Sequence, residues 1–178
     1  MLHKIISGGQ TGADQAALDV AREWAIPYGG WIPKGRLTER GPLPMKYDQM
    51  QEMNTACDVD TNSDDAYYAA RTEQNVMDSD ATLLFCRGGE QQLEGGTAYT
   101  LEMARNKHNK PCLCVDSSIK QENTDSNKTA FETAAEIVSW LEEHHVKRLN
   151  VAGPRASKDP NIYQDTTDVL TLVLSHLH

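Results

Sequence analysis

Two short stretches of the chain carry residue types that bind phosphate or another oxyanion. The first reads SGGQTGAD and the second reads EGGT, and together they contain Gly8, Gly9, Gln10, Thr11, Gly12, Asp14, Glu94, Gly95, Gly96 and Thr97. Glycine lets the backbone turn its N–H groups toward a ligand, and a helix that begins behind such a loop adds unpaired donors. The two threonine hydroxyls can donate as well. These residues therefore predict a nest of donors for a small anion.

Three basic side chains could supply the positive charge of such a site. Lys34 and Arg155 each follow a glycine-bearing turn, and a guanidinium can hold an oxyanion through two parallel hydrogen bonds. Arg71 shares about one helical turn with Thr72 and Asn75, so the three can lie on one face. For Arg71 two interpretations stay open, a ligand-facing pair with an aspartate or a structural network at the end of its helix.

The first glycine-rich stretch matches neither of the common phosphate-binding fingerprints. It has no lysine behind its last glycine, as a P-loop requires, and it lacks the G-x-G-x-x-G order of dinucleotide-binding proteins. A dinucleotide cofactor is therefore disfavoured. A mononucleotide, a pterin phosphate or an inorganic oxyanion fits better.

The net charge of the chain excludes some classes of partner. The 178 residues include 26 Asp and Glu against 17 Lys and Arg, which gives a net charge of -9. Nucleic acid polymers and anionic membranes would be repelled by such a protein. No apolar run reaches the length of a membrane span, and the N-terminus lacks the layout of a signal peptide. We therefore expect one cytoplasmic domain over residues 1–178.

The sequence predicts no metal site. Three of the four cysteines lie in apolar runs typical of buried strands, so we interpret them as free thiols; the four are Cys57, Cys86, Cys112 and Cys114. Segment 58–65 resembles the start of a calcium-binding loop, but Ser63 and Ala69 stand where that loop needs glycine and glutamate. A solvated loop is the better interpretation.

Apolar runs alternate with helical patterns from one end of the chain to the other. The runs predict strands over 3–7, 26–31, 81–86, 111–115 and 148–152. The helical patterns cover 14–24, 63–77, 95–106, 128–145 and 160–177, with a long polar connection over 33–62 and an exposed loop over 116–127. Such alternation is typical of a three-layer, Rossmann-like, doubly wound α/β fold with a mainly parallel sheet of about five or more strands.

This fold would bring the candidate residues together. In a parallel sheet all carboxyl ends lie at one edge, and ligands bind there, where the strand order reverses. Four of the loops that follow the predicted strands contain glycine, namely those at 8–14, 29–35, 87–97 and 153–155. Several such loops at one edge indicate a ligand site more strongly than any one of them.

The quoted stretches also resemble a known family. GGQTGADQAALDVA, PKGR, YAARTEQNVMDSDATLLF, GGTAYT, NKP and NVAGPRASKDPNIY are similar to the putative molybdenum carrier family, in the same order and over nearly the whole chain. That family resembles the LOG-like Rossmann proteins, which bind nucleotides and related ligands. The resemblance implies a carrier of molybdenum cofactor, a pterin phosphate with an oxidised metal centre, and a homo-oligomer, either a dimer or a tetramer.

The same resemblance implies an enzymatic alternative. LOG phosphoribohydrolases cleave nucleoside monophosphates with a PGGxGTxxE motif, and the corresponding stretch here is EGGTAYTLE. Glu94 replaces the proline, and Glu102 is expected on a different helical face. Hydrolysis would then need Asp14 or Glu94 as the catalytic carboxylate, with no cofactor. A nucleotide sensor without transferable cargo is a third possibility.

Overall fold

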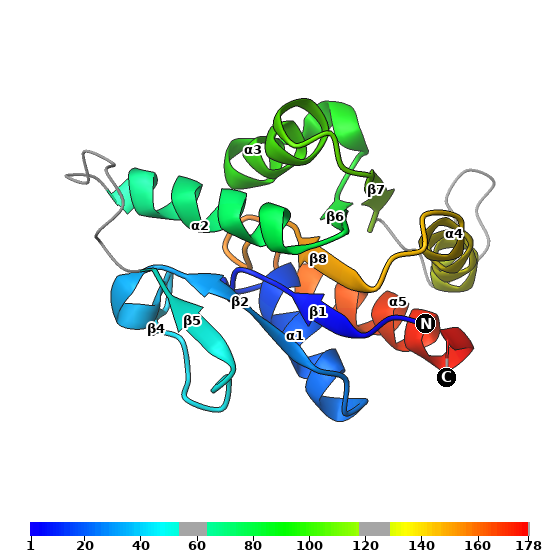
Figure 1. The fold of residues 1–178 in the computed structure, drawn as a ribbon, viewed down its shortest axis with the longest axis horizontal. Coiled ribbons are helices and arrows are strands. Elements are labelled where there is room, and N and C mark those ends of the chain that lie inside the picture. The colour runs from blue at the N-terminus through cyan, green and yellow to red at the C-terminus, as the bar shows by residue number, and fades with distance from the viewer. Residues whose placement is uncertain (54–63, 118–128, 178) are drawn as a thin grey trace.

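A parallel sheet forms the centre of the protein (Figure 1). The computed structural model describes residues 1–53, 64–117 and 129–177. Its six-stranded sheet has the order β5-β2-β1-β8-β6-β7, with β1 (Lys4–Ile6), β2 (Tyr28–Ile32), β5 (Met50–Glu52), β6 (Ala81–Cys86), β7 (Cys112–Asp116) and β8 (Arg148–Ala152). Every neighbouring pair is parallel; Ile5, for example, lies between Tyr28 and Leu149. The predicted α/β class is confirmed.

Helices cover both faces of the sheet, which makes three layers (Figure 1). On one face α1 (Ala13–Glu23) packs against α5 (Ile162–Leu177), and α5 packs against α4 (Ala130–Glu143). On the other face α2 (Asp64–Asp78) contacts α3 (Gly95–Glu102), which continues as a π-helical turn over Met103–Lys107. Among the described residues no helix has both the length and the apolar character to cross a membrane.

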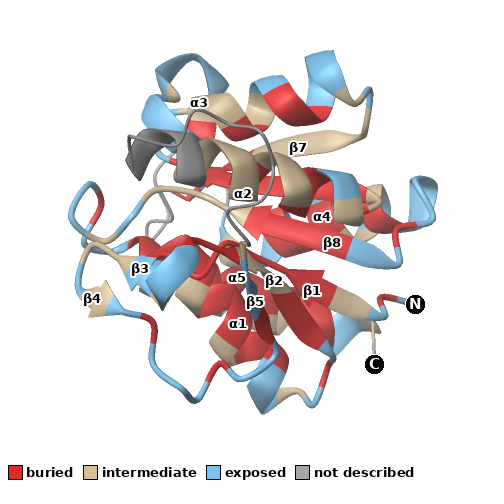
Figure 2. Cartoon of the chain, turned by 60° about the vertical axis from the view of Figure 1, so that its left-hand side comes forward, coloured by how far each residue is buried: buried red, intermediate tan, exposed pale blue. Residues whose placement is uncertain are grey.

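The main core lies between the sheet and the α1, α4 and α5 layer. β6 is buried along its whole length, as a continuous apolar run predicts for a strand covered on both faces. Its residues Ala81, Leu83 and Phe85 join the core that α1 and α5 complete. Figure 2 shows the buried residues along β1, β8 and α1. α4 begins at a capping box, in which Thr129 and Glu132 satisfy each other's backbone N–H groups.

Two of the expected connections were wrong in part. The polar stretch 33–62 contains a short 3-10 turn over Lys34–Arg36, the antiparallel hairpin of β3 (Leu37–Thr38) and β4 (Gly41–Pro42), and the edge strand β5. Within the expected loop 116–127, Asp116 ends β7 and Ser117 is buried. The remainder of that loop lies outside the described residues, as do Cys57 and the calcium-like residues 58–63.

The strand order is that of a Rossmann sheet whose chain starts at an unusual point. If the two ends were joined and the chain were read from β8, then β8, β1, β2, β6 and β7 would take the spatial order 3-2-1-4-5. The two termini lie close together in Figures 1 and 2, as such a rearrangement requires. The point at which the strand order reverses is then between β8 and β6, and ligands of this fold bind beyond the strands at that point.

Candidate functional site

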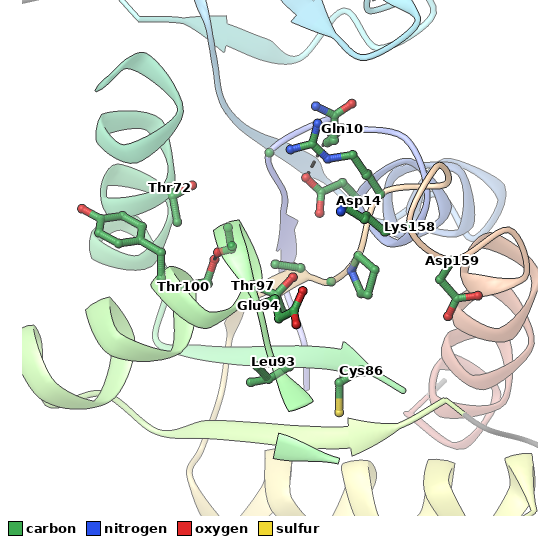
Figure 3. Close-up of a pocket in the computed structure, with 18 of the residues that line it drawn as sticks. Gln10, Asp14, Thr72, Cys86, Leu93, Glu94, Thr97, Thr100, Lys158 and Asp159 are labelled. Atoms are coloured by element: carbon green, nitrogen blue, oxygen red, sulfur yellow. Dashed lines mark hydrogen bonds between the residues drawn. The ribbon is translucent and has the colours of Figure 1, made fainter. Parts of the chain in front are cut away.

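A cavity of about 950 Å³ opens beyond the carboxyl ends of β1, β6 and β8. Gly8 follows β1, Arg87 follows β6, and Gly153 follows β8, so the cavity lies at the reversal of the strand order. α2 and the beginning of α3 form its other walls. Figure 3 shows Glu94 and Thr97 on the α3 side and Asp14 and Lys158 opposite them. Its volume is in the range of small-molecule sites.

Most of the residues that the sequence singled out line this cavity. They are Gly8, Gln10, Asp14, Arg71, Glu94, Gly95, Gly96, Thr97 and Arg155. They come from three loops and from the helices α1, α2 and α3, which are far apart in the chain. The structure therefore brings them together at the sheet edge where we expected a ligand site.

Four of the predicted ligand-binding residues do not line the cavity. These are Gly9, Thr11, Gly12 and Lys34. A Cβ on Gly9 would meet Leu43, and one on Gly12 would lie 2.5 Å from the carbonyl oxygen of Pro154. These two glycines therefore allow close packing against neighbouring protein. Thr11 accepts a hydrogen bond from the N–H of Ala156 and donates to Glu39, so its hydroxyl is already engaged. Lys34 is exposed in the 3-10 turn after β2.

Asp14 and Arg71 form the inner wall of the cavity. Arg71 Nη1 lies 3.4 Å from Asp14 Oδ2, and the same oxygen accepts the N–H of Gln10 at 3.2 Å. Burial raises the pKa of the Asp14 carboxyl, although the charge of Arg71 and the N–H of Gln10 act in the opposite direction. The aspartate partner that the sequence left open for Arg71 is therefore Asp14, 57 residues away.

The Arg71 guanidinium keeps hydrogen-bonding capacity that the protein does not use. Its bond to Asp14 is long, its Nε atom is buried without a hydrogen-bond partner among the described residues, and its Cζ lies 5.7 Å from the centre of the Tyr68 ring. A guanidinium has five donors in a planar fork that matches phosphate or carboxylate. A buried donor left unpaired is costly, and because Arg71 lines the cavity, a shift of its guanidinium toward an anionic ligand there would relieve that cost.

The beginning of α3 presents backbone donors to the same cavity. Glu94, the residue before the helix, makes no side-chain cap, and Gly95 has a φ of 54°, in the left-handed region. A Cβ on Gly95 or Gly96 would meet no atom within 4 Å, so this turn is open to the cavity. The first N–H groups of a helix have no partner inside the helix and attract anions. Thr97 lies in the same turn and lines the cavity.

The outer wall contains one basic residue that forms ion pairs with the protein and two that do not, among the described residues. Arg87 donates to Asp159 and to Asp165, each at 2.8 Å, which ties the end of β6 to the start of α5. The positive charge of Arg87 is therefore balanced by these two carboxylates. Arg155 and Lys158 are exposed at the cavity and have no ion pair among the described residues. Lys158 was missed from sequence, although it follows Arg155 in the same glycine-bearing loop.

The end of α2 contains the structural network that the sequence offered as the second interpretation. Asn75 accepts the N–H of Trp31 at 2.7 Å and donates to its carbonyl at 3.1 Å, while the indole of Trp31 donates to Asp78 at 2.7 Å. Trp31 thus joins β2 to α2 and is not in the cavity lining. Asn75 and Thr72 line the cavity beside Arg71. α2 therefore serves both the site and the network.

No group of side chains within the described ranges could hold a metal ion by its geometry. Cys86, Cys112 and Cys114 are free thiols, and Cys86 also lines the cavity. A hydrogen bond with Cys114 and burial raise the pKa of the Cys86 thiol, so it is protonated at neutral pH. Any anion in the cavity would therefore be held by nitrogen and hydroxyl donors.

The profile of one protein family, the circularly permutated YpsA SLOG family, matches residues 5–174. The chain belongs to this family. The permutation that the family's description states agrees with the strand order, in which β8 takes the first place of a Rossmann sheet. The match also agrees with the resemblance that the sequence motifs indicated.

A solved structure supports the same relationship for this SLOG family member. The structure of a protein from Syntrophus aciditrophicus SB, named as a "putative molybdenum carrier protein", is 47% identical, covers 97% of this chain and 95% of its own, and superposes with a TM-score of 0.82. A diphosphate reductase of the non-mevalonate pathway, at 12% identity and a TM-score of 0.37, is too distant to bear on function. No curated protein sequence matches the chain.

Proposed function

We propose that this protein carries a small ligand bearing a phosphate or another oxyanion, with molybdenum cofactor as the cargo. The observation that supports this proposal most directly is that two sets of hydrogen-bond donors line the same cavity. The guanidinium of Arg71 lines the cavity and its Nε has no hydrogen-bond partner in the part of the chain that the structure describes, and the open first turn of α3 offers backbone N–H groups. The 47% identical Syntrophus protein is named as a "putative molybdenum carrier protein", which supports a cargo that contains molybdenum.

The chemistry of the lining fits a polar, planar ligand with one anionic end. Tyr68, Leu93 and Tyr99 give the cavity apolar and aromatic surface, while Arg155 and Lys158 add charge at its outer wall. A cavity of about 950 Å³ has room for a pterin phosphate or a mononucleotide. Such a protein would hold its cargo without turnover. A cytoplasmic homo-oligomer, either a dimer or a tetramer, belongs to the same proposal.

Native mass spectrometry tests the cargo directly. The protein would be expressed in a host that makes molybdenum cofactor, and a retained mass of pterin or nucleotide size supports the proposal. The same spectrum gives the oligomeric state. A ligand-free spectrum is followed by titration with molybdenum cofactor, released from a molybdoenzyme under anaerobic conditions. Failure to bind in that titration contradicts the carrier function.

Variants test the residues of the site. Arg155→Ala and Thr97→Val should each weaken binding, and loss of a hydrogen bond to a charged ligand corresponds to roughly ten- to hundredfold. Lys34→Ala is the matched control, because Lys34 is an exposed loop cation outside the cavity lining. If Arg155→Ala and Thr97→Val both bind like the parent, the site is wrongly assigned.

Hydrolysis of a nucleoside monophosphate is the second candidate, and one observation favours it. Asp14 and Glu94 both line the cavity, and burial raises the pKa of Asp14, as in many acid–base catalysts. Glu102 is exposed and lies outside the cavity lining, so it does not supply the carboxylate of the hydrolase motif. This activity predicts release of free base, abolished by Asp14→Asn or Glu94→Gln. The absence of free base with every common nucleoside monophosphate would exclude it.

A further inference from the structure

The hairpin formed by β3 and β4 places a carboxylate against two loops of the cavity. Glu39, at the hairpin turn, accepts hydrogen bonds from the Thr11 hydroxyl and from both the N–H and the hydroxyl of Ser157; the bond to the Ser157 N–H is 3.1 Å long. Glu39 itself is not part of the cavity lining. It therefore connects the glycine-rich loop after β1 with the loop between β8 and α5.

Gln10 extends this connection to the inner wall. Its side-chain oxygen accepts the N–H of Glu39 at 2.9 Å and the N–H of Thr11 at 3.0 Å. The Thr11 hydroxyl in turn accepts the N–H of Ala156 at 3.1 Å. Three segments that are separate in the chain are thus joined by one set of hydrogen bonds around Glu39.

The segment that Glu39 holds begins next to Arg155. The carbonyl of Arg155 accepts the N–H groups of Lys158 and Asp159 at 2.9 and 3.1 Å, so residues 155–159 form one turn. Fixing Ala156 and Ser157 from outside therefore also fixes the backbone from which Arg155 and Lys158 project. Although burial acts in the opposite direction, the bonds from Ser157 and Thr11 and the charge of Arg155 lower the pKa of Glu39, so it is ionised at neutral pH.

We propose that Glu39 is a positioning residue for the anion site, which holds Gln10 and the Arg155 loop in the arrangement that ligand binding requires. The inference rests on the proposed function, since it assumes that an anion binds in the cavity. It adds a residue that neither touches the ligand nor belongs to a glycine-rich stretch.

An NMR titration of the full chain with inorganic phosphate tests this assignment. In the parent the amide signals of Gly95, Gly96 and Thr97 should shift with phosphate and give a dissociation constant. Glu39→Ala should raise that constant about tenfold, the lower end of what losing a group that orients a binding residue costs. Glu39→Gln should restore most of the affinity, because its amide oxygen can accept the bonds from the Thr11 hydroxyl and the Ser157 N–H, while its NH2 group can donate to the Ser157 hydroxyl oxygen. Glu52→Ala is the matched control, since Glu52 accepts the Gly35 N–H at 2.7 Å away from the cavity.

A double-mutant cycle separates positioning from general destabilisation. If Glu39 acts through Arg155, then Glu39→Ala should weaken phosphate binding much less in an Arg155→Ala background than in the parent. Thr11→Val removes the hydroxyl between Glu39 and Ala156 and gives a second test if Glu39→Ala does not fold. Parent-like affinity in both Glu39→Ala and Thr11→Val, or full additivity with Arg155→Ala, overturns the assignment. If the parent itself shows no phosphate response, the proposed function fails along with it.

Discussion

The guanidinium of Arg71 occupies the space that a side chain at Gly8 would need. A Cβ built on Gly8 would lie 1.2 Å from Arg71 Nη1 and 2.9 Å from Asp14 Oδ2. The φ of Gly8 is not in the left-handed region, so this glycine is required by close approach and not by backbone conformation. The first glycine of the loop thus makes room for the cation that faces the cavity.

Gly8→Ala should therefore displace Arg71. The obstructing atoms belong to the far end of a flexible side chain, so we expect a modest loss of about 1–2 kcal/mol in the free energy of unfolding. Ligand affinity should fall about tenfold, because the guanidinium leaves its position beside Asp14. Gly96→Ala is the control for stability, since its Cβ would meet no atom within 4 Å. Urea denaturation and calorimetric titration measure the two effects, and unchanged affinity in Gly8→Ala would show that Arg71 does not contact the ligand.

Asp14→Asn should separate binding from hydrolysis. With the negative charge removed, Arg71 is no longer neutralised, so a carrier should bind an anionic ligand at least as tightly as the parent. A hydrolase that uses Asp14 should lose its turnover while it still binds nucleotide. Binding by calorimetry and release of free base by chromatography, on the same preparation, distinguish the two. Weaker binding by Asp14→Asn would mean that the carboxylate itself contacts the cargo.

The contribution of Asp14 to the free energy of unfolding should change with pH in a defined direction. Its pKa is raised in the folded state above the ordinary value of 3.8, so the folded protein binds this proton more tightly than the unfolded chain does. The contribution of Asp14 to stability is thus largest below pH 3.8 and falls as the pH rises through the folded pKa. The difference in unfolding free energy between Asp14→Asn and the parent should shift in favour of the variant from pH 4 toward pH 7. A constant difference over this range would show that Arg71 fully compensates the burial of the carboxylate.

The sequence predicted five strands of the sheet, including β7 at one edge, but it missed β5 at the other edge and the separate β3–β4 hairpin. β6 is an apolar run that is buried along its whole length, and such a run can be recognised without any tertiary information. β5 has only one buried residue of three, and β3 and β4 have two residues each. Such short polar strands have no period of their own, and they form because the neighbouring strand or hairpin partner is in place.

Local patterns in the sequence could single out residues of the candidate site, but not the long-range contacts of those residues. The turn at Gly95 can be recognised from its own residues, because glycines at the start of a helix leave the backbone there open. Thr11 carries the same local signal but is engaged by Glu39 and Ala156, which lie 28 and 145 residues away. No pattern of neighbouring residues in the sequence indicates contacts between residues so far apart in the chain. The partner of Arg71 was left open for the same reason.

Asp80 should be a determinant of stability in acid. It accepts the N–H groups of Lys147 and Arg148 at 3.0 and 2.7 Å and pairs with the Arg148 guanidinium at 2.9 Å. Although partial burial acts in the opposite direction, these bonds lower the pKa of Asp80 below its ordinary value of 3.8. Its contribution is therefore present above pH 3.8 and is lost as the pH falls through the lower folded pKa.

Asp80→Asn should accordingly lower the free energy of unfolding by about 1–2 kcal/mol at pH 7, with a smaller effect near pH 3. Asp168→Asn is the control, because Asp168 is exposed and bonded only to Gln164 among the described residues. Urea denaturation at the two pH values measures the difference. Equal effects of Asp80→Asn at both pH values would show that its bonds do not depend on ionisation.

Lys110 offers a contrast to Arg71, because it is a cation near α2 whose donors are already used. Its Nζ donates to the carbonyls of Val76, Met77 and Ser79 at 3.0, 2.6 and 2.7 Å and so satisfies the end of α2. Lys110→Met should lower the free energy of unfolding by about 1–3 kcal/mol, since these carbonyls lose a charged donor.

The same substitution should leave ligand affinity within about twofold of the parent, because Lys110 is not in the cavity lining. Lys147→Met is the matched control, as Lys147 is exposed and its side chain has no hydrogen bond or ion pair among the described residues. A tenfold loss of affinity in Lys110→Met would mean that the end of α2 controls the position of Arg71. The network around Asn75 and Trp31 would then be part of the binding site, and not only a link between α2 and the sheet.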